Sequence, residues 1–139
     1  MSLELVIVTP EREAFRGPVK RVVLPGSEGE FGVLEGHERF LCPLRIGEVE
    51  IDGEGEPRFA ALSDGFADVG ESSVVVMVDT CELAEEIDVA RAERARARAE
   101  EALARLHEGT PESDSNFRHA QAALQRALVR LQVAARRAR

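Results

Sequence analysis

The stretch "VVVMVDTCELAEEIDVARA" (residues 74–92) separates two parts of the sequence that have different hydrophobic periods. Before Asp79, short apolar segments are separated by turns rich in glycine and proline, which is typical of β-strands. From about Ile87 onward, apolar residues recur every three or four positions, which is typical of amphipathic helices. The change of period predicts a β part over residues 1–84 and a helical part over residues 85–139.

The first part contains several candidate strands at close spacing. They end at turn signals such as Pro25-Gly26 and Ser63-Asp64-Gly65. The candidates are "LELVIV" (3–8), "VKRVVL" (19–24), "LRIGEVEI" (44–51), "RFAAL" (58–62), "FADV" (66–69) and "SSVVVMVD" (72–79). No long helix lies between them, so the pattern argues against a parallel doubly wound sheet and favours an antiparallel β-sandwich or a small barrel.

The second part carries two matching apolar seams, which predict an antiparallel two-helix hairpin and hence an α+β fold overall. The seam of the later helix consists of Phe117, Ala120, Leu124, Ala127, Leu131, Ala134 and Ala138. That of the earlier helix, expected from about Ile87 to His107, consists of Ala92, Ala95, Ala99, Ala102 and Leu106. Pro111 separates the helices, and Ser113 or Asp114 is expected to cap the second one. Because alanine buries little apolar area, we expect the hairpin to be weakly held.

The composition narrows the class of protein. With 44% hydrophobic and 32% charged residues, the chain has the balance of a folded globular protein. Its net charge of −8 and its aromatic set of six phenylalanines argue against a nucleic-acid-binding surface. The charge is uneven: residues 1–84 sum to −10 and residues 85–139 to +2. The basic segment 117–139 has six arginines and no acid, which is typical of a solvated face or of a surface for an acidic partner.

Cys42 and Cys81 are far apart in an acidic chain, and we expect them to be reduced, buried thiols. The N-terminal residues show no charged region followed by an apolar one, so no targeting segment is expected. The longest strongly apolar run, residues 74–78, is far too short to span a membrane. These features predict a cytosolic or peripheral protein.

The segment "GSEGEFGVLEGH" (residues 26–37) resembles the epsilon subunit of the rotary F-type ATP synthase, apart from Glu35, where that family usually has proline. The likeness extends along the whole chain, through "VIVTPE" (6–11), residues 74–92 and "ALQRALVRLQVA" (123–134). The resemblance implies a non-catalytic subunit that couples proton flow to ATP synthesis. It implies a β-sandwich that binds the gamma subunit and the c-ring, with Glu30 facing the ring and His37 facing gamma or the ring.

The resemblance also implies a mobile hairpin that either folds against the sandwich or extends along gamma. In the extended form its basic helix would meet the alpha and beta subunits and restrain ATP hydrolysis. Contact with the membrane would occur only through the c-ring, at the cytoplasmic face of the bacterial plasma membrane.

ATP-binding members of this family carry the motif I/L-D-x-x-R-A at the start of the first helix. The motif is intact here as Ile87, Asp88, Arg91 and Ala92. By spacing from it, the family's other ligand positions correspond to Glu82, Arg98, Arg126 and Arg130. The resemblance therefore implies ATP as a regulatory ligand and no resident cofactor.

The spacing of the arginines supports an anion site independently of the family. Arg91 and Arg98 are seven residues apart on one helix face, and Arg126 and Arg130 are four apart on another. In an antiparallel hairpin the four guanidinium groups would converge on one edge, where phosphate oxygens could bind them. The alternative is that both faces are solvated, with Glu93, Glu100 and Glu101 partly neutralising them.

Other motifs give weaker indications. His37 lies near Glu35 and Glu38, but no second histidine follows at metalloprotease spacing, and no metal site is expected. The glycines of "GEGEP" (53–57) lack the residues of a phosphate-binding loop. No catalytic nucleophile is recognisable. Two alternatives to the synthase subunit remain open: a free-standing nucleotide-sensing hairpin, and a small enzyme using His37 and Glu38.

Overall fold

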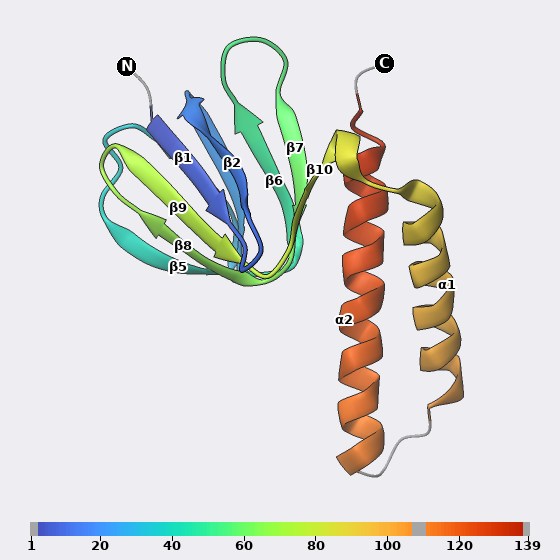
Figure 1. Cartoon of the computed structure of the whole chain (residues 1–139). Helices are drawn as coiled ribbons and strands as arrows, with labels where there is room; N and C mark the ends of the chain where they lie inside the picture. Colours follow the sequence, from blue (N-terminus) through green and yellow to red (C-terminus); the bar gives the residue numbers. More distant parts are fainter. Residues whose placement is uncertain (1–2, 107–110, 138–139) are drawn as a thin grey trace.

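The computed structural model describes residues 3–106 and 111–137. A curled sheet occupies the N-terminal part, and two antiparallel helices lie beside it (Figure 1). Within the described residues the strands are β1 (Leu3–Val8), β2 (Glu13–Val19), β3 (Arg21–Gly26), β4 (Gly29–Leu34), β5 (Phe40–Leu44), β6 (Gly47–Asp52), β7 (Arg58–Leu62), β8 (Gly65–Val69), β9 (Ser73–Val78) and β10 (Cys81–Leu83). A short 3-10 helix, η1 (Ala84–Glu86), leads to α1 (Val89–Arg105) and α2 (Pro111–Ala134). The expected β-sandwich followed by a helical hairpin is confirmed.

The strands form one path, β10-β7-β6-β3-β5-β8-β9-β1-β2, from which β4 branches by pairing with β3. The pairings are antiparallel except for one, in which β1 lies parallel to β9 along residues 4–8 and 73–77. This parallel pairing brings the first strand of the chain beside a strand that follows about seventy residues later. The run β5-β8-β9-β1-β2 is thereby held together by a contact between residues distant in sequence.

Alternation along the strands builds an aliphatic core between the layers. In β9, Val74, Val76 and Val78 point inward and are buried, whereas Val75 and Met77 point outward. The same alternation in the other strands contributes leucine, isoleucine and valine to a single cluster. Cys81 is buried in this cluster, and that burial raises the pKa of its thiol to about 12, so the thiol stays protonated at neutral pH. Cys42 is only half-buried.

Several strand boundaries differ from the sequence-based expectation. The segment expected as one strand over residues 44–51 corresponds to β6, which begins only at Gly47, and its first residue, Leu44, ends the separate strand β5. The expected strand at residues 19–24 corresponds to β3, which begins only at Arg21. Strands β2, β4, β5 and β10 were not predicted. β4 contains two glycines and a glutamate, and within the described residues it pairs only with β3, so neither its composition nor its burial gives a clear strand pattern.

The helices follow the predicted seams. Ala92 and Ala99 of α1 and Ala127 of α2 are buried in the hairpin, while Phe117 at the far end of the seam remains exposed. The expected cap of the second helix is wrong: α2 begins at Pro111, so Ser113 and Asp114 lie within it. Proline suits this first position because it needs no amide donor there. Two further predicted positions, His107 and Ala138, lie outside the described residues.

The hairpin meets the sandwich near the C-terminal end of α2, while the other end of both helices extends beyond the sheet (Figure 1). At the contact, Ala61 of β7 and Ala84 and Ile87 of the connecting segment pack against Val133 and Ala134. Phe59 and Val129 cover the edge of this small cluster. Neither helix, within the described residues, has the length and hydropathy needed to cross a membrane.

Gly65 at the start of β8 provides a test of sheet packing. A β-carbon there would overlap the carbonyl oxygen of Met77 and lie 2.9 Å from the Cγ1 atom of Val78. We expect Gly65→Ala to lower the free energy of unfolding by about 1–3 kcal/mol, because β8 and β9 cannot separate without disturbing the core. Denaturant unfolding followed by circular dichroism measures this loss.

The matched control is Gly32→Ala in β4, where the nearest neighbouring atom of the new β-carbon would be Arg21 Cδ at 3.9 Å. This change should leave stability within about 0.5 kcal/mol of the parent. Equal losses at the two positions would contradict the proposed overlap at Gly65.

Candidate functional site

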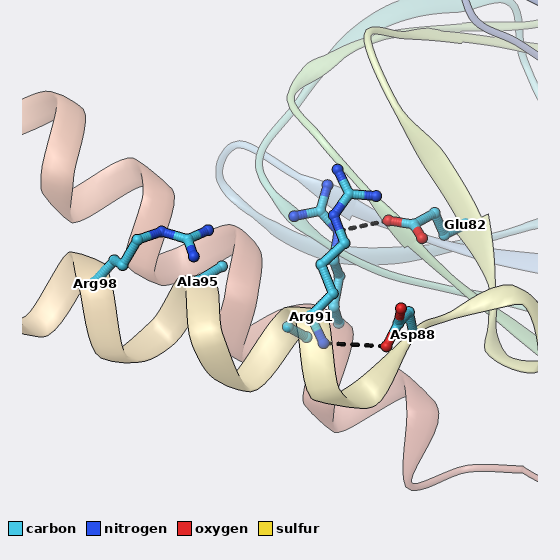
Figure 2. Close-up of a pocket in the computed structure, with 7 residues that line it drawn as sticks. Glu82, Asp88, Arg91, Ala95 and Arg98 are labelled. Carbon is cyan, nitrogen blue, oxygen red and sulfur yellow. Dashed lines mark hydrogen bonds and ion pairs between the residues drawn. The ribbon is translucent and has the colours of Figure 1, made fainter.

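A hollow of about 140 Å³ lies where α1 approaches α2 and β10. Figure 2 shows Arg91 and Arg98 on the same side of α1, with Ala95 between them and Glu82 opposite. The residues that line it are Glu82, Asp88, Arg91, Ala92, Ala95, Arg98 and Arg130. The alanines leave the centre of the hollow open, and charged groups surround it.

Asp88 positions the start of α1. It has an extended backbone at the N-cap, and its Oδ1 accepts a hydrogen bond from the backbone N–H of Arg91 at 3.1 Å. This bond satisfies one of the amide donors that the first helical turn leaves without a partner. It also orders the backbone of the first helical turn, to which Arg91 belongs.

Arg130 is held by Glu82 on the opposite wall. The Nε atom of Arg130 donates to Glu82 Oε1 at 2.6 Å, and the two side chains are partly buried, at 26% and 31% exposure. Glu82 belongs to β10 and Arg130 to α2, so the pair joins the sandwich to the hairpin. A charge-assisted bond sheltered from water in this way is stronger than one on an open surface.

Four of the five arginines of α1 fall into two groups, and the fifth, Arg94, is exposed and does not line the hollow. Arg96 binds Glu93 and Glu100, each at 2.6 Å, and Arg105 binds Glu101 at 3.2 Å, along the outer side of the helix. Hydrogen bonding to Glu93 raises the pKa of Arg96. For these two arginines the alternative of a neutralised, solvated face is correct.

Arg91 and Arg98 differ from that group. Among the residues that the structure describes, neither guanidinium group has a hydrogen-bonded or ion-paired partner, and both groups face the hollow (Figure 2). Like charges so placed would be stabilised by an anion between them.

Two of the eight residues expected in the ATP site lie elsewhere. Ile87 is buried in the apolar contact with Val133, where its role is packing. Arg126 lines a smaller neighbouring hollow with Ser63 and Thr80, which shares only Arg130 with the main one. Ala95 lines the main hollow, although it was predicted as a seam residue and not as part of the ATP site. Its position one helical turn from both Arg91 and Arg98 is the signal that could have identified it.

The residues expected to contact partner subunits lie apart from this hollow. Glu30 is near the beginning of β4, and His37 follows the other end of that strand. The ring of His37 packs 5.0 Å from that of Phe40, and its Nδ1 atom lies 2.9 Å from the backbone oxygen of Glu38. Within the described residues, no group of three or more His, Cys, Asp or Glu side chains is arranged to hold a metal ion.

Comparisons with known proteins agree with this architecture. The β-sandwich domain of the ATP synthase delta/epsilon chain matches residues 2–84, and the long α-helix domain of that chain matches residues 85–135. The chain therefore belongs to the ATP synthase delta/epsilon chain family.

Individual relatives place it among the epsilon chains. The ATP synthase epsilon chains of Geotalea uraniireducens and Citrifermentans bemidjiense are each 44% identical to it over 138 residues, covering 99% of this chain and 97% of theirs. It is thus of the epsilon type, a non-catalytic subunit rather than a nucleotide sensor or enzyme acting alone.

Solved structures show the same fold. A chain in the cryo-EM structure of the Euglena gracilis mitochondrial ATP synthase, comprising OSCP, F1 and the c-ring, aligns with a TM-score of 0.79 and 25% identity. The alignment covers 96% of this chain and 81% of that one. A chain of the central stalk and c-ring of the Tetrahymena thermophila enzyme aligns at 0.67 with 12% identity, covering 94% and 97% of the two chains, and shows the fold alone.

The role of Asp88 as a cap can be tested separately from its charge. Asp88→Ala should lower the free energy of unfolding of the hairpin by about 1 kcal/mol, since the backbone N–H of Arg91 loses its acceptor. Asp88→Asn should leave stability nearly unchanged, because asparagine caps helices as well as aspartate does. Urea unfolding followed by helical circular dichroism compares the two, and an equal loss in both variants would show that Asp88 acts through its charge instead.

Proposed function

We propose that this epsilon chain regulates its ATP synthase through the hairpin, which binds ATP when folded against the sandwich and restrains ATP hydrolysis when extended. The observation that carries the proposal is the hollow itself. Arg91 and Arg98 face it without a carboxylate partner among the described residues, and Arg130 faces it from the opposite helix. Guanidinium groups bind phosphate oxygens in pairs of parallel hydrogen bonds, so three of them around one space favour a polyphosphate ligand.

The ion pair between Glu82 and Arg130 affects how the ligand enters. In the structure Glu82 supplies the anion next to Arg130, so a phosphate group that binds Arg130 has to compete with this carboxylate. The volume of about 140 Å³ is also smaller than the roughly 300 Å³ of ordinary ligand pockets. We therefore expect the phosphates to occupy the hollow, with part of the nucleotide outside it or with Glu82 and Arg130 moved apart.

The isolated chain should bind ATP. At an ATP concentration of a hundred times the dissociation constant, binding should raise the free energy of unfolding by about 2.7 kcal/mol. Arg91→Ala or Arg98→Ala should each weaken binding about tenfold or more, because a charge-assisted bond to phosphate is lost. Arg126→Ala should have a smaller effect, because Arg126 lines the neighbouring hollow. Titration calorimetry measures the affinities.

Arg96→Ala is the matched control, since Arg96 lies on the same helix but binds Glu93 and Glu100 on the outer side. It should leave ATP affinity unchanged. If the parent chain gives no heat of binding at millimolar ATP, Arg91 and Arg98 form part of a solvated face and not of a nucleotide site.

Regulation requires that the folded and extended hairpins be close in free energy. The contact between α1 and α2 consists largely of alanines such as Ala92, Ala99 and Ala127, and the contact with the sandwich is small. A ligand shifts such an equilibrium only by the difference between its affinities for the two forms. A binding free energy of ATP that is a few kcal/mol more favourable for the folded form than for the extended form would be enough to shift the population toward the folded form.

Removal of residues 117–139 should raise ATP hydrolysis by the assembled enzyme while leaving assembly intact. The physical reason is that the deleted segment carries six arginines and no acid, and so provides the basic surface that would engage acidic parts of the catalytic subunits. Steady-state hydrolysis by the purified complex is the measurement. An unchanged rate in a fully assembled complex would show that α2 does not inhibit.

For assembly, we propose that residues 1–84 bind the gamma subunit and the c-ring, and that residues 85–139 regulate. The outer face of the sheet β5-β8-β9 carries Leu41, Phe66 and Met77, all exposed, with Phe66 and Met77 opposite each other across the strands. A shallow hollow of about 490 Å³ adjoins Phe66 and Met77. This apolar surface is suited to gamma, and Glu30 to the c-ring, which would place the chain at the cytoplasmic face of a bacterial plasma membrane.

A chain that ends at Glu86 should fold on its own and still bind gamma, because the core cluster lies entirely within the sandwich. In this fragment Phe66→Asp should abolish co-purification with gamma without loss of β structure. Leu34→Asp, an equally exposed leucine in β4, is the control and should retain binding. An unfolded fragment would mean that the sandwich depends on the hairpin.

A further inference from the structure

Arg136 binds the sandwich just beyond the end of α2. Its Nε and one terminal nitrogen each donate to a carboxylate oxygen of Glu48 in β6 at 3.1 Å. Its guanidinium carbon lies 4.8 Å from the centre of the Phe59 ring in β7, which is a cation–π distance. The side chain of Glu48 is only 12% exposed, whereas that of Arg136 is 47% exposed, so the ion pair lies at the rim of the contact with its carboxylate side buried.

Arg137 binds the segment that connects the two parts of the chain. Its Nε atom donates to the backbone oxygen of Ala84 at 2.8 Å, and a terminal nitrogen donates to the backbone oxygen of Ile87. Ala84 is the first residue of η1, and Ile87 lies between η1 and α1, where the chain passes from sandwich to hairpin. Arg137, which follows the C-terminal end of α2, thus holds the segment that leads into α1.

The apolar part of the docking contact is small. It consists of three alanines, Ile87 and Val133, with Phe59 and Val129 at its edge. Alanine side chains bury little area, so the contact alone gives weak stabilisation. Among the described residues, the polar side-chain contacts of α2 and of the turn after it with the sandwich and the connecting segment come from Arg130, Arg136 and Arg137, and Arg130 already belongs to the nucleotide site.

We infer that Arg136 and Arg137, bound to Glu48, Phe59 and the carbonyl groups of Ala84 and Ile87, form a C-terminal clamp that keeps the hairpin docked on the sandwich. The clamp lies outside the helix seam and does not line the hollow. Its loss therefore frees the hairpin while the residues that line the hollow stay in place, and Arg118, Arg126 and Arg130 of the basic segment remain on the helix. Removal of residues 136–139 and removal of residues 117–139 then have opposite consequences: the first favours undocking, and the second deletes the element that undocks.

Docking can be followed directly with Phe59→Trp, because the sequence contains no tryptophan or tyrosine. In the full chain, the introduced indole should be shielded beneath α2 and Arg136 and be weakly quenched by acrylamide. In a chain ending at Ala135, and in Arg136→Ala/Arg137→Ala, quenching should rise at least about threefold. Arg118→Ala, which removes an exposed arginine at the far end of the same helix, is the control and should leave quenching unchanged.

A charge exchange tests the pairing itself. Glu48→Arg and Arg136→Glu should each increase quenching, and the double variant should recover at least half of the protection. Unchanged quenching in the chain ending at Ala135, with its helical circular dichroism intact, would overturn the clamp. The clamp would also be overturned if quenching in the double variant were as high as the two single-variant increases added together.

The effect on activity rests on the proposed regulation and has its own readout. If the extended hairpin inhibits, Arg136→Ala/Arg137→Ala should lower ATP hydrolysis by the assembled enzyme at least about twofold, and ATP added to the isolated variant should restore shielding of the introduced indole. Undocking without either effect would support the clamp and reject the regulation. Intact docking in the variant would reject the clamp whatever the activity.

Discussion

The bond between Arg130 and Glu82 is the interaction on which the site depends. Glu82 lies on the last strand of the sheet and Arg130 on the last helix, so their contact at 2.6 Å exists only when the hairpin is docked. The same contact closes one wall of the hollow between α1 and α2. The residues around the hollow therefore come from both parts of the chain. The binding of a ligand that contacts both walls depends on the position of the hairpin as well as on its arginines.

The sequence predicted the arrangement of the fold well because its signals are local. The change of period near residues 79–87 marks the boundary between sheet and helices, and the alanine seams identify which helix faces meet. Strands such as β4 and β10 were not predicted because they are short or polar and depend on a partner strand distant in sequence. The start of α2 was placed too late because proline was taken as a helix breaker, although it is favoured in the first turn.

The site was predicted only in part, for a related reason. Sequence spacing places Arg91 and Arg98 on one face, and the structure confirms that geometry. Spacing alone cannot show that Arg126 turns toward Ser63 and Thr80, because that depends on how deeply α2 packs against β7. Nor can it show that Arg136 and Arg137 bind Glu48 and the connecting segment, since these contacts join residues fifty or more positions apart.

The parallel pairing of β1 with β9 bears on how the chain acquires its structure during synthesis. The first strand leaves the ribosome early, but its parallel neighbour is complete only when Val78 has been made. Until then β1 has β2 as its antiparallel partner and one unpaired edge, whereas α1 and α2 can associate as soon as both exist. Long-range strand pairing of this kind slows folding relative to helical hairpins. A nascent sandwich interrupted before β9 thus presents an unpaired edge of β1 to other chains until that strand is complete.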